Sequence, residues 1–244
     1  MSAEGNSDVF VIFDLRMEDT FARMVGKVGL ERSYLDSGGE AGDIFHSGAL
    51  SERQPSGRDE DHFTYNPLDT LPGELELKPN ENYLTDGTGN LNLYGNGLVY
   101  HSDPFDKPTE ITGTLKFTAW IAMDVPDTDL AVSVEEILPN GSSVHLTGDL
   151  LRARYRESLR KPVLVTAGEI NRYEFTTFQY FSRRIAKGSR LRLLLQCPNS
   201  IQIEKNYNSG GDVAREAGKD ARIAHIRLVH DAAHPSHLDL PIVE

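Results

Sequence analysis

Two aspartates and three arginines are the side chains of this sequence best suited to charge chemistry. Asp127 and Asp129 precede an alternating apolar segment, and Arg152, Arg154 and Arg156 recur at every second position after it. A guanidinium pairs with a carboxylate through two parallel hydrogen bonds, and a buried arginine without a partner would cost roughly 3 kcal/mol or more. The sequence therefore predicts a structural ion-pair network among these five residues. A binding site for an anionic substrate is the less expected alternative, because structural networks also gather such charges.

A β-hairpin is expected to position these charges. Apolar side chains alternate with small or polar ones in residues 130–135 and again in 143–147, and this two-residue period is typical of half-buried strands. Residues 139–142, Pro-Asn-Gly-Ser, supply the turn between the two runs. After Gly148 we expect a third strand over 151–156, which would place the three arginines on one face.

Two other clusters have the side chains for metal binding. His230, His234 and His237 lie close together in the sequence, but Pro235 interrupts the helix that would put the three rings on one face. Calcium binding by the aspartates between positions 124 and 149 is a similar minority interpretation, because the Asp-x-Asp-x-Asp-Gly loop is absent. We therefore expect neither a metal ion nor a cofactor.

The sequence lacks the motif Gly-x-Ser-x-Gly, which in α/β-hydrolases exposes a nucleophilic serine on a strained turn. Nor does it alternate strands with helices, as the parallel sheet of such enzymes requires. We expect no catalytic residue in this chain. Whether the chain is an enzyme remains open at this point.

Composition excludes some classes of partner. The net charge is −12, from 37 acidic against 25 basic residues, and such a surface repels nucleic acid and anionic membranes. The single cysteine, Cys197, has no partner for an internal disulfide. No apolar run approaches the roughly 18 residues that a membrane helix needs, and residues 1–8 lack the features of a signal peptide. We expect a cytoplasmic protein that binds neither nucleic acid nor membranes.

The remaining alternation predicts an all-β fold. Strands are expected over 98–105, 111–121, 171–177, 190–197, 221–229 and 237–242, and strands of this length separated by turns indicate a β-sandwich. The N-terminal third is expected to be rich in loops, with a strand over 9–13, a helix over 17–30, an edge strand over 74–78, a turn-rich loop over 40–71 and irregular structure over 80–97. We expect a single domain over 33–244 that follows an uncertain segment, 1–32, of a strand and a helix.

Several motifs resemble the C-terminal, non-catalytic β-domain of the serine hydrolases that include X-Pro dipeptidyl-peptidases, cocaine esterase and α-amino acid ester hydrolases. The similar stretches are Pro126-Asp127-Thr128-Asp129, Leu138-Pro139-Asn140-Gly141, and the segments 151–158, 167–169, 187–192, 206–211 and 234–242, and together they span about Gly97 to the C-terminus. Residues 33–39 also fit a Tyr-Leu-x-Ser-Gly-Gly strand and turn of the family, and residues 63–69 resemble a strand of the family that ends in Asp-Pro or Asn-Pro. The tryptophan- and proline-rich connection that precedes this turn in the family is missing from this sequence, so the resemblance does not place residues 14–32.

The resemblance implies a jelly-roll β-sandwich of the galactose-binding-like type, an accessory domain without a catalytic site of its own. In the family a Ser-His-Asp triad lies on a separate α/β-hydrolase domain, so the implied partner is such a catalytic chain or a second copy of this one. The loop Asn206, Tyr207 and Asn208 would then be an interface loop, with a solvated turn as the alternative. A free-standing carbohydrate- or small-ligand-binding module is the second hypothesis for the whole chain.

Overall fold

The computed structural model describes residues 27–57, 59–71, 96–200 and 202–243 of the chain. These residues form thirteen strands: β1 (Val28–Asp36), β2 (Gly48–Ser51), β3 (Glu60–Tyr65), β4 (Gly97–Ser102), β5 (Thr109–Gly113), β6 (Lys116–Met123), β7 (Asp129–Ile137), β8 (Ser143–Arg152), β9 (Asn171–Phe175), β10 (Phe181–Ile185), β11 (Arg190–Gln196), β12 (Ala224–Val229) and β13 (His237–Val243). Three 3₁₀ turns accompany them: η2 (Ala153–Tyr155), η3 (Val213–Arg215) and η4 (Gly218–Asp220).

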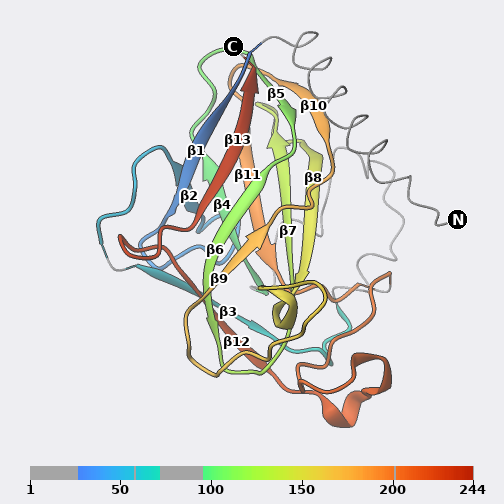
Figure 1. Ribbon diagram of the computed structural model, residues 1–244. Coiled ribbons are helices and arrows are strands. Elements are labelled where there is room, and N and C mark those ends of the chain that lie inside the picture. The colour runs from blue at the N-terminus through green and yellow to red at the C-terminus, as the bar shows by residue number, and fades with distance from the viewer. Residues whose placement is uncertain (1–26, 58, 72–95, 201, 244) are drawn as a thin grey trace, which may run out of the picture.

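The strands join in one hydrogen-bonded path that folds over itself into two layers (Figure 1). The order along the path is β3-β12-β6-β13-β1-β2-β4-β11-β7-β8, and β9, β5 and β10 attach at its side. Neighbouring strands run antiparallel except for β2 and β4, which pair in parallel. The expected all-β, jelly-roll β-sandwich is confirmed.

The core lies between the layers and is filled by alternate residues of the strands. Buried side chains from β4, β7 and β11 meet those from β6, β9, β12 and β13 there, and the largest of them are Tyr100, Tyr173, Phe117 and Phe175. The rings of Phe117 and Phe175 contact each other across β6 and β9, with their centroids 5.6 Å apart. Alternation in the sequence correctly predicted the buried faces of the first half of β7 and of β12, whereas β4, β11 and β13 are buried on both faces. Among the described residues, no helix is long and apolar enough to cross a membrane.

The strand predicted over 111–121 is two strands, and this prediction was wrong. β5 ends at Gly113, whose backbone has a φ of 140°, a conformation that favours glycine. A Cβ atom at Gly113 would lie 3.1 Å from the ring of Pro241, so the close approach of β13 also requires glycine. The chain changes direction there, because β5 pairs with β10 while β6 runs between β9 and β12.

Other predictions for the N-terminal third were wrong or lie outside the described residues. Residues 28–30 belong to strand β1 instead of a helix, because Val28 and Leu30 pair with Val243 and Pro241 of β13. The turn-rich segment 40–71 contains β2, which was not expected, and β3, which overlaps the strand that residues 63–69 resemble. Gly97, expected in an irregular segment, is the first residue of β4. The predicted strands over 9–13 and 74–78, the helix over 17–26 and the irregular segment over 80–95 lie outside the described residues.

Candidate functional site

Asp127 and Asp129 lie at the start of β7 and are almost completely buried, with exposed fractions of 0% and 3%. Arg152, the last residue of β8, is directly opposite Asp129 in the register of the hairpin. Its Nε and Nη2 atoms donate to the two oxygens of Asp129 at 2.7 and 3.0 Å. This bidentate contact raises the pKa of the Arg152 guanidinium, so the pair stays charged.

Arg154 reaches Asp127 from a turn and not from a strand. β8 continues unbroken through Gly148 and ends at Arg152, so the third strand predicted over 151–156 was wrong. The chain turns into η2 because Asp127 binds both the backbone N–H and the Nε of Arg154, each at 2.8 Å. A carboxylate that accepts both groups holds the turn and the side chain together.

Arg156 stands apart from the two aspartates. Its Nη1 donates to the carbonyl oxygen of Val163 at 2.6 Å, and its Nε donates to the amide oxygen of Asn171 at 3.2 Å. These contacts fasten the loop that follows η2 to the sandwich. The structure therefore brings four of the five predicted charged residues into one network and gives Arg156 a separate structural role.

Asn206 joins the two ion pairs into one network. Its amide nitrogen donates to Asp127 Oδ2 at 2.8 Å and to Asp129 Oδ1 at 3.0 Å. Burial raises the pKa of Asp127, while hydrogen bonds from Asn206 and Arg154 act in the opposite direction. The network is therefore suited to hold the structure in place, and the Asp127 carboxylate, which is 0% exposed, has no open side for a substrate.

The loop 206–211 is built on this network. The backbone N–H of Asn208 donates to Asn206 Oδ1 at 2.9 Å, and Asn208 adopts a φ of 64° with its amide bound to the carbonyl of Arg222 at 2.8 Å. Asn206 and Asn208 are 2% and 0% exposed, so these two side chains of the predicted interface loop are directed into the domain. Only Tyr207 of the three is left at the surface, half-buried.

Glu216, which the sequence analysis did not single out, fixes the other half of the loop. Its carboxylate accepts the backbone N–H groups of Tyr207 at 3.1 Å and Gly211 at 3.0 Å, and it also accepts the hydroxyl of Ser209. Nothing in the local sequence marks this residue, because its partners are set by the folded loop. The loop is held rigidly at both ends.

Replacing Gly210 by alanine should disturb this loop more than a comparable change elsewhere. Gly210 has a φ of 83°, and a Cβ atom there would lie 2.8 Å from the ring of Pro126. Gly141 has a similar φ of 87°, but a Cβ there meets nothing within 4 Å. We expect Gly141→Ala to cost about 1 kcal/mol of unfolding free energy through φ alone, and Gly210→Ala to cost about 1–3 kcal/mol more through the clash. Urea denaturation of both variants measures the difference, and equal losses would contradict it.

A second buried cluster, which the sequence analysis missed, contains a serine, a histidine and an aspartate. Asp61 Oδ2 accepts hydrogen bonds from Ser37 Oγ at 2.7 Å and Tyr100 Oη at 2.5 Å, and it lies 2.8 Å from His230 Nε2. Burial raises the pKa of Asp61, but the hydrogen bonds from His230, Tyr100 and Ser37 outweigh it and hold that pKa below its ordinary value.

This cluster does not have the geometry of a catalytic triad. In a triad the aspartate binds one ring nitrogen of the histidine and the serine binds the other. Here Ser37 and Asp61 both lie beside Nε2 of His230, and the serine hydroxyl is directed at the carboxylate. The nearby N–H of Gly39 donates to Ser37 Oγ itself at 3.1 Å, so it is not placed to stabilise an oxyanion.

The histidines near the C-terminus do not converge. His230 belongs to the buried cluster, His234 contacts Asp231 at 3.0 Å, and Nδ1 of His237 contacts the carbonyl of Pro235 at 2.7 Å. Within the ranges that the structure describes, no three His, Cys, Asp or Glu side chains gather as a group that could hold a metal ion. Asp149, one of the aspartates considered for calcium binding, instead accepts hydrogen bonds from the backbone N–H and the hydroxyl of Thr177.

His101 of β4 makes stability depend on pH. Arg192 Nε donates to His101 Nε2 at 2.9 Å, which requires a neutral ring, and burial beside Arg192 and Arg190 lowers the pKa of His101 from 6.5 to about 4. As pH falls below 6.5, the His101 ring takes up a proton in the unfolded chain before it does so in the folded chain. The free energy of unfolding therefore falls by on the order of 2 kcal/mol by pH 4. Urea denaturation at pH 7.5 and 4.5 measures the unfolding free energy lost between the two pH values. This loss should be smaller for His101→Gln than for the unchanged chain, whereas His62→Gln, at an exposed site, should lose as much as the unchanged chain.

Known proteins resemble this chain along most of its length. Residues 28–239 match the family model described as the X-Pro dipeptidyl-peptidase C-terminal non-catalytic domain. The chain is 29% identical over 215 residues to a cocaine esterase of Rhodococcus sp. (strain MB1 Bresler), with 86% of this chain and 37% of that protein covered.

Solved structures show the same fold at lower identity. An aminopeptidase of a marine sediment Thaumarchaeota archaeon superposes with a TM-score of 0.77 at 16% identity, covering 89% of this chain and 37% of that one. An α-amino acid ester hydrolase gives a TM-score of 0.73 at 18% identity, covering 87% and 36%. The chain thus spans little more than a third of the length of these relatives.

Proposed function

This chain belongs to the family of X-Pro dipeptidyl-peptidase C-terminal non-catalytic domains, and on that premise we propose that it is an accessory domain that docks on an α/β-hydrolase catalytic unit. One observation carries the proposal. The buried Asp127, Asp129 and Asn206 network, together with Glu216, holds the surface loop 206–211 in a single conformation. A loop ordered before binding loses less conformational entropy on association, so it suits a docking surface.

Apolar side chains surround this loop at the same end of the sandwich. Leu164 is 49% exposed and approaches Gly210, and Ile223 is 51% exposed and follows Arg222, whose backbone N–H donates to the carbonyl of Tyr207 at 2.9 Å. Exposed apolar side chains beside a half-buried tyrosine are typical of the centre of a protein interface. The docking surface is therefore defined by Tyr207, Leu164 and Ile223.

The absence of catalysis by the isolated chain is tested with two substrates, a p-nitrophenyl ester and an X-Pro-p-nitroanilide, with and without a serine-reactive phosphonate. We expect no turnover and no labelled serine, because Ser37 lacks both a correctly placed base and an oxyanion site. Phosphonate-sensitive turnover at an enzymatic rate would overturn the accessory role, and the labelled residue would identify the nucleophile.

Docking is tested by sedimentation with the catalytic unit of a cocaine-esterase-type hydrolase prepared without its own C-terminal domain. We expect a complex with the unchanged chain and at least roughly tenfold weaker binding for Leu164→Asp, because the charge would be buried in the interface. Leu30→Asp is the control, since Leu30 is 69% exposed on the distant strand β1. Equal weakening by both changes, or no complex with any chain, would contradict the proposal.

Carbohydrate binding is the second candidate, and one observation favours it. Tyr34 and Trp120 lie on the same outer face of the β1, β13 and β6 layer, where their rings pack against His237 and His234 with centroids 5.8 and 5.0 Å apart. Aromatic rings on a polar face can stack on sugars. Retention of the chain on immobilised polysaccharide, lost in Trp120→Ala, would support this candidate over docking.

A further inference from the structure

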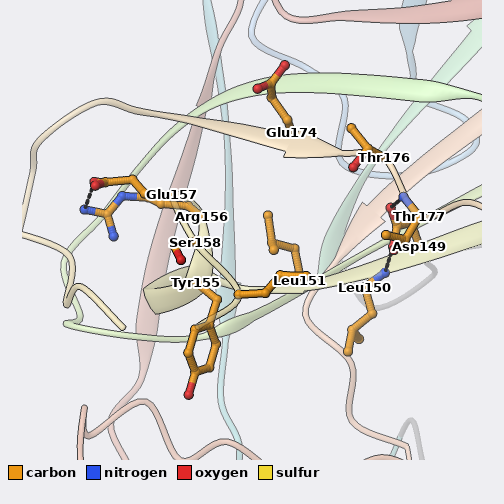
Figure 2. Close-up of a pocket in the computed structure, with 11 residues that line it drawn as sticks. Asp149, Leu150, Leu151, Tyr155, Arg156, Glu157, Ser158, Glu174, Thr176 and Thr177 are labelled. Carbon is orange, nitrogen blue, oxygen red and sulfur yellow. Dashed lines mark hydrogen bonds and ion pairs between the residues drawn. The ribbon is translucent and has the colours of Figure 1, made fainter. Parts of the chain in front are cut away.

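An open cleft lies where the edges of the two layers meet (Figure 2). Its walls come from the end of β8, from η2 and the residues after it, and from β9, and its volume is about 270 Å³. Figure 2 shows Leu151 and Tyr155 on one side and Glu174 and Thr176 on the other. Leu151 also packs against the main core, so the edge of the core forms the floor of the cleft.

Strand β9 brings an open edge to this cleft. Among the described strands it pairs only with β6, so alternate peptide groups of residues 171–175 on its other side have no strand partner. Arg172 and Lys116 both bond to the carboxylate of Glu174, at 2.9 and 2.6 Å, and Figure 2 shows this carboxylate turned away from Leu151 and Tyr155. The charges that usually protect an edge strand are thus drawn away from the cleft.

The mouth of the cleft is apolar, and the described residues leave it open. Leu159 is 76% exposed and Leu150 is 44% exposed, although both line the cleft. Asp149 accepts the backbone N–H of Thr177 at 2.8 Å and its hydroxyl at 2.5 Å, and these bonds fix the chain that leaves β9 against β8. The opening is therefore a fixed feature of the fold.

We propose that this cleft binds an extended peptide segment of a partner protein, which adds a strand to β9 and inserts one apolar side chain between Leu151, Tyr155 and Leu159. A volume of about 270 Å³ is below the 300–1,000 Å³ typical of drug-sized ligands, so it suits a single large side chain better than a small molecule. Strand addition supplies affinity through backbone hydrogen bonds, and a side-chain pocket supplies specificity.

Charge defines the partner further. Two carboxylates, those of Asp149 and Glu157, and the guanidinium of Arg156 line the cleft, whereas the Glu174 carboxylate is turned away from it and is paired with Arg172 and Lys116. The Arg156 side chain is only 5% exposed and is held by the carbonyl oxygen of Val163 and, at 3.4 Å, by the carboxylate of Glu157. The Glu157 side chain is 62% exposed, so the exposed charge at the rim is negative. The segment that fits carries Lys or Arg two residues from its apolar side chain, because residues two apart in a strand lie on the same side.

The test is titration of the ¹⁵N-labelled chain, followed by amide NMR shifts, with the capped peptide Thr-Leu-Thr-Lys-Thr as the probe. We expect shift changes confined to residues 149–159 and 171–177. Replacing the peptide leucine by serine, or its central threonine by proline, should weaken binding by about tenfold, because the first removes the buried group and the second removes a backbone donor. A proline peptide that binds as well as the original would overturn strand addition.

Chain variants give an independent check. Leu159→Asp should weaken binding of the probe peptide by about tenfold. Glu157→Lys should make the chain prefer a probe peptide in which glutamate replaces the lysine. Leu30→Asp, at another exposed leucine, should leave binding unchanged. Shift changes outside the cleft, or no binding by any probe, would overturn the proposal. Neither result bears on the docking surface at Tyr207, Leu164 and Ile223, which the peptide does not use.

Discussion

Replacing Asp127 by alanine is expected to lower the free energy of unfolding by about 3–5 kcal/mol, the range found when one partner of a buried ion pair is removed. The change leaves the Arg154 guanidinium and backbone N–H and the Asn206 amide without the oxygens that they now contact at 2.8 Å. Asn206 keeps its contact with Asp129 Oδ1 at 3.0 Å, but Arg154 has no other carboxylate in the network, because Asp129 is already held by Arg152. Urea denaturation followed by fluorescence measures the loss.

Two controls separate this effect from a general loss of charge. Asp212→Ala removes one partner of the exposed Arg215 pair, whose side chains are 86% and 61% exposed, and should change stability by no more than about 1 kcal/mol. Asp127→Asn keeps one acceptor oxygen, so its loss of unfolding free energy should fall between those of Asp127→Ala and Asp212→Ala. Faster amide exchange at Tyr207 in Asp127→Ala, without a change in β4 or β11, is expected because the loop depends on Asn206. A loss below about 1 kcal/mol for Asp127→Ala would contradict the assigned role.

The hairpin could be predicted from local sequence, but its register could not. Around the turn Ile137 pairs with Ser143, and continuing that register would place Asp129 opposite Leu151. A bulge between Val134 and Glu135 shifts the pairing by one residue, so Asp129 faces Arg152 instead. A one-residue shift exchanges the two faces of a strand, and alternation alone does not reveal where a bulge occurs.

The rest of the network depends on parts of the chain that lie far apart. Asn206 reaches Asp127 across 79 residues of sequence, and Glu216 acts only on a loop that must fold first. Composition correctly suggested a turn at 206–211, but it could not show that Asn206 and Asn208 point inward. Residue type predicts that a charge needs a partner, and only the fold determines which partner it finds.

The same distinction explains how the strand over 111–121 was mispredicted. The apolar alternation on either side of Gly113 is real, since Ile111 and Phe117 are both buried in the core. What divides the segment is the approach of Pro241 to Gly113, a contact between residues 128 positions apart. Periodicity predicts which face of a segment is buried, but it does not predict whether the whole segment pairs with the same neighbouring strand.

Changes in the buried cluster around Asp61 should strongly lower the free energy of unfolding, and the cluster should have no catalytic activity. Asp61→Ala leaves the hydroxyls of Ser37 and Tyr100 and the ring nitrogen of His230 without the oxygen that lies within 2.8 Å of each. Each buried donor left unsatisfied costs about 1–3 kcal/mol, so we expect a total loss of at least about 3 kcal/mol. The loss should appear in urea denaturation as a lower midpoint with an unchanged slope.

The matched variants for this cluster are Tyr100→Phe and Ser37→Ala, which each remove one donor and leave the acceptor satisfied by the others. Each should cost about 0.5–1.5 kcal/mol, less than Asp61→Ala, because no buried group loses its last partner. If Ser37 were instead a nucleophile, Ser37→Ala would abolish phosphonate labelling of the folded chain. The geometry, with Ser37 Oγ directed at a carboxylate 2.7 Å away, predicts no labelling to abolish. The cluster therefore joins the ends of β1 and β12 to β3 and β4, and its polar groups stabilise the layers at the point where they meet.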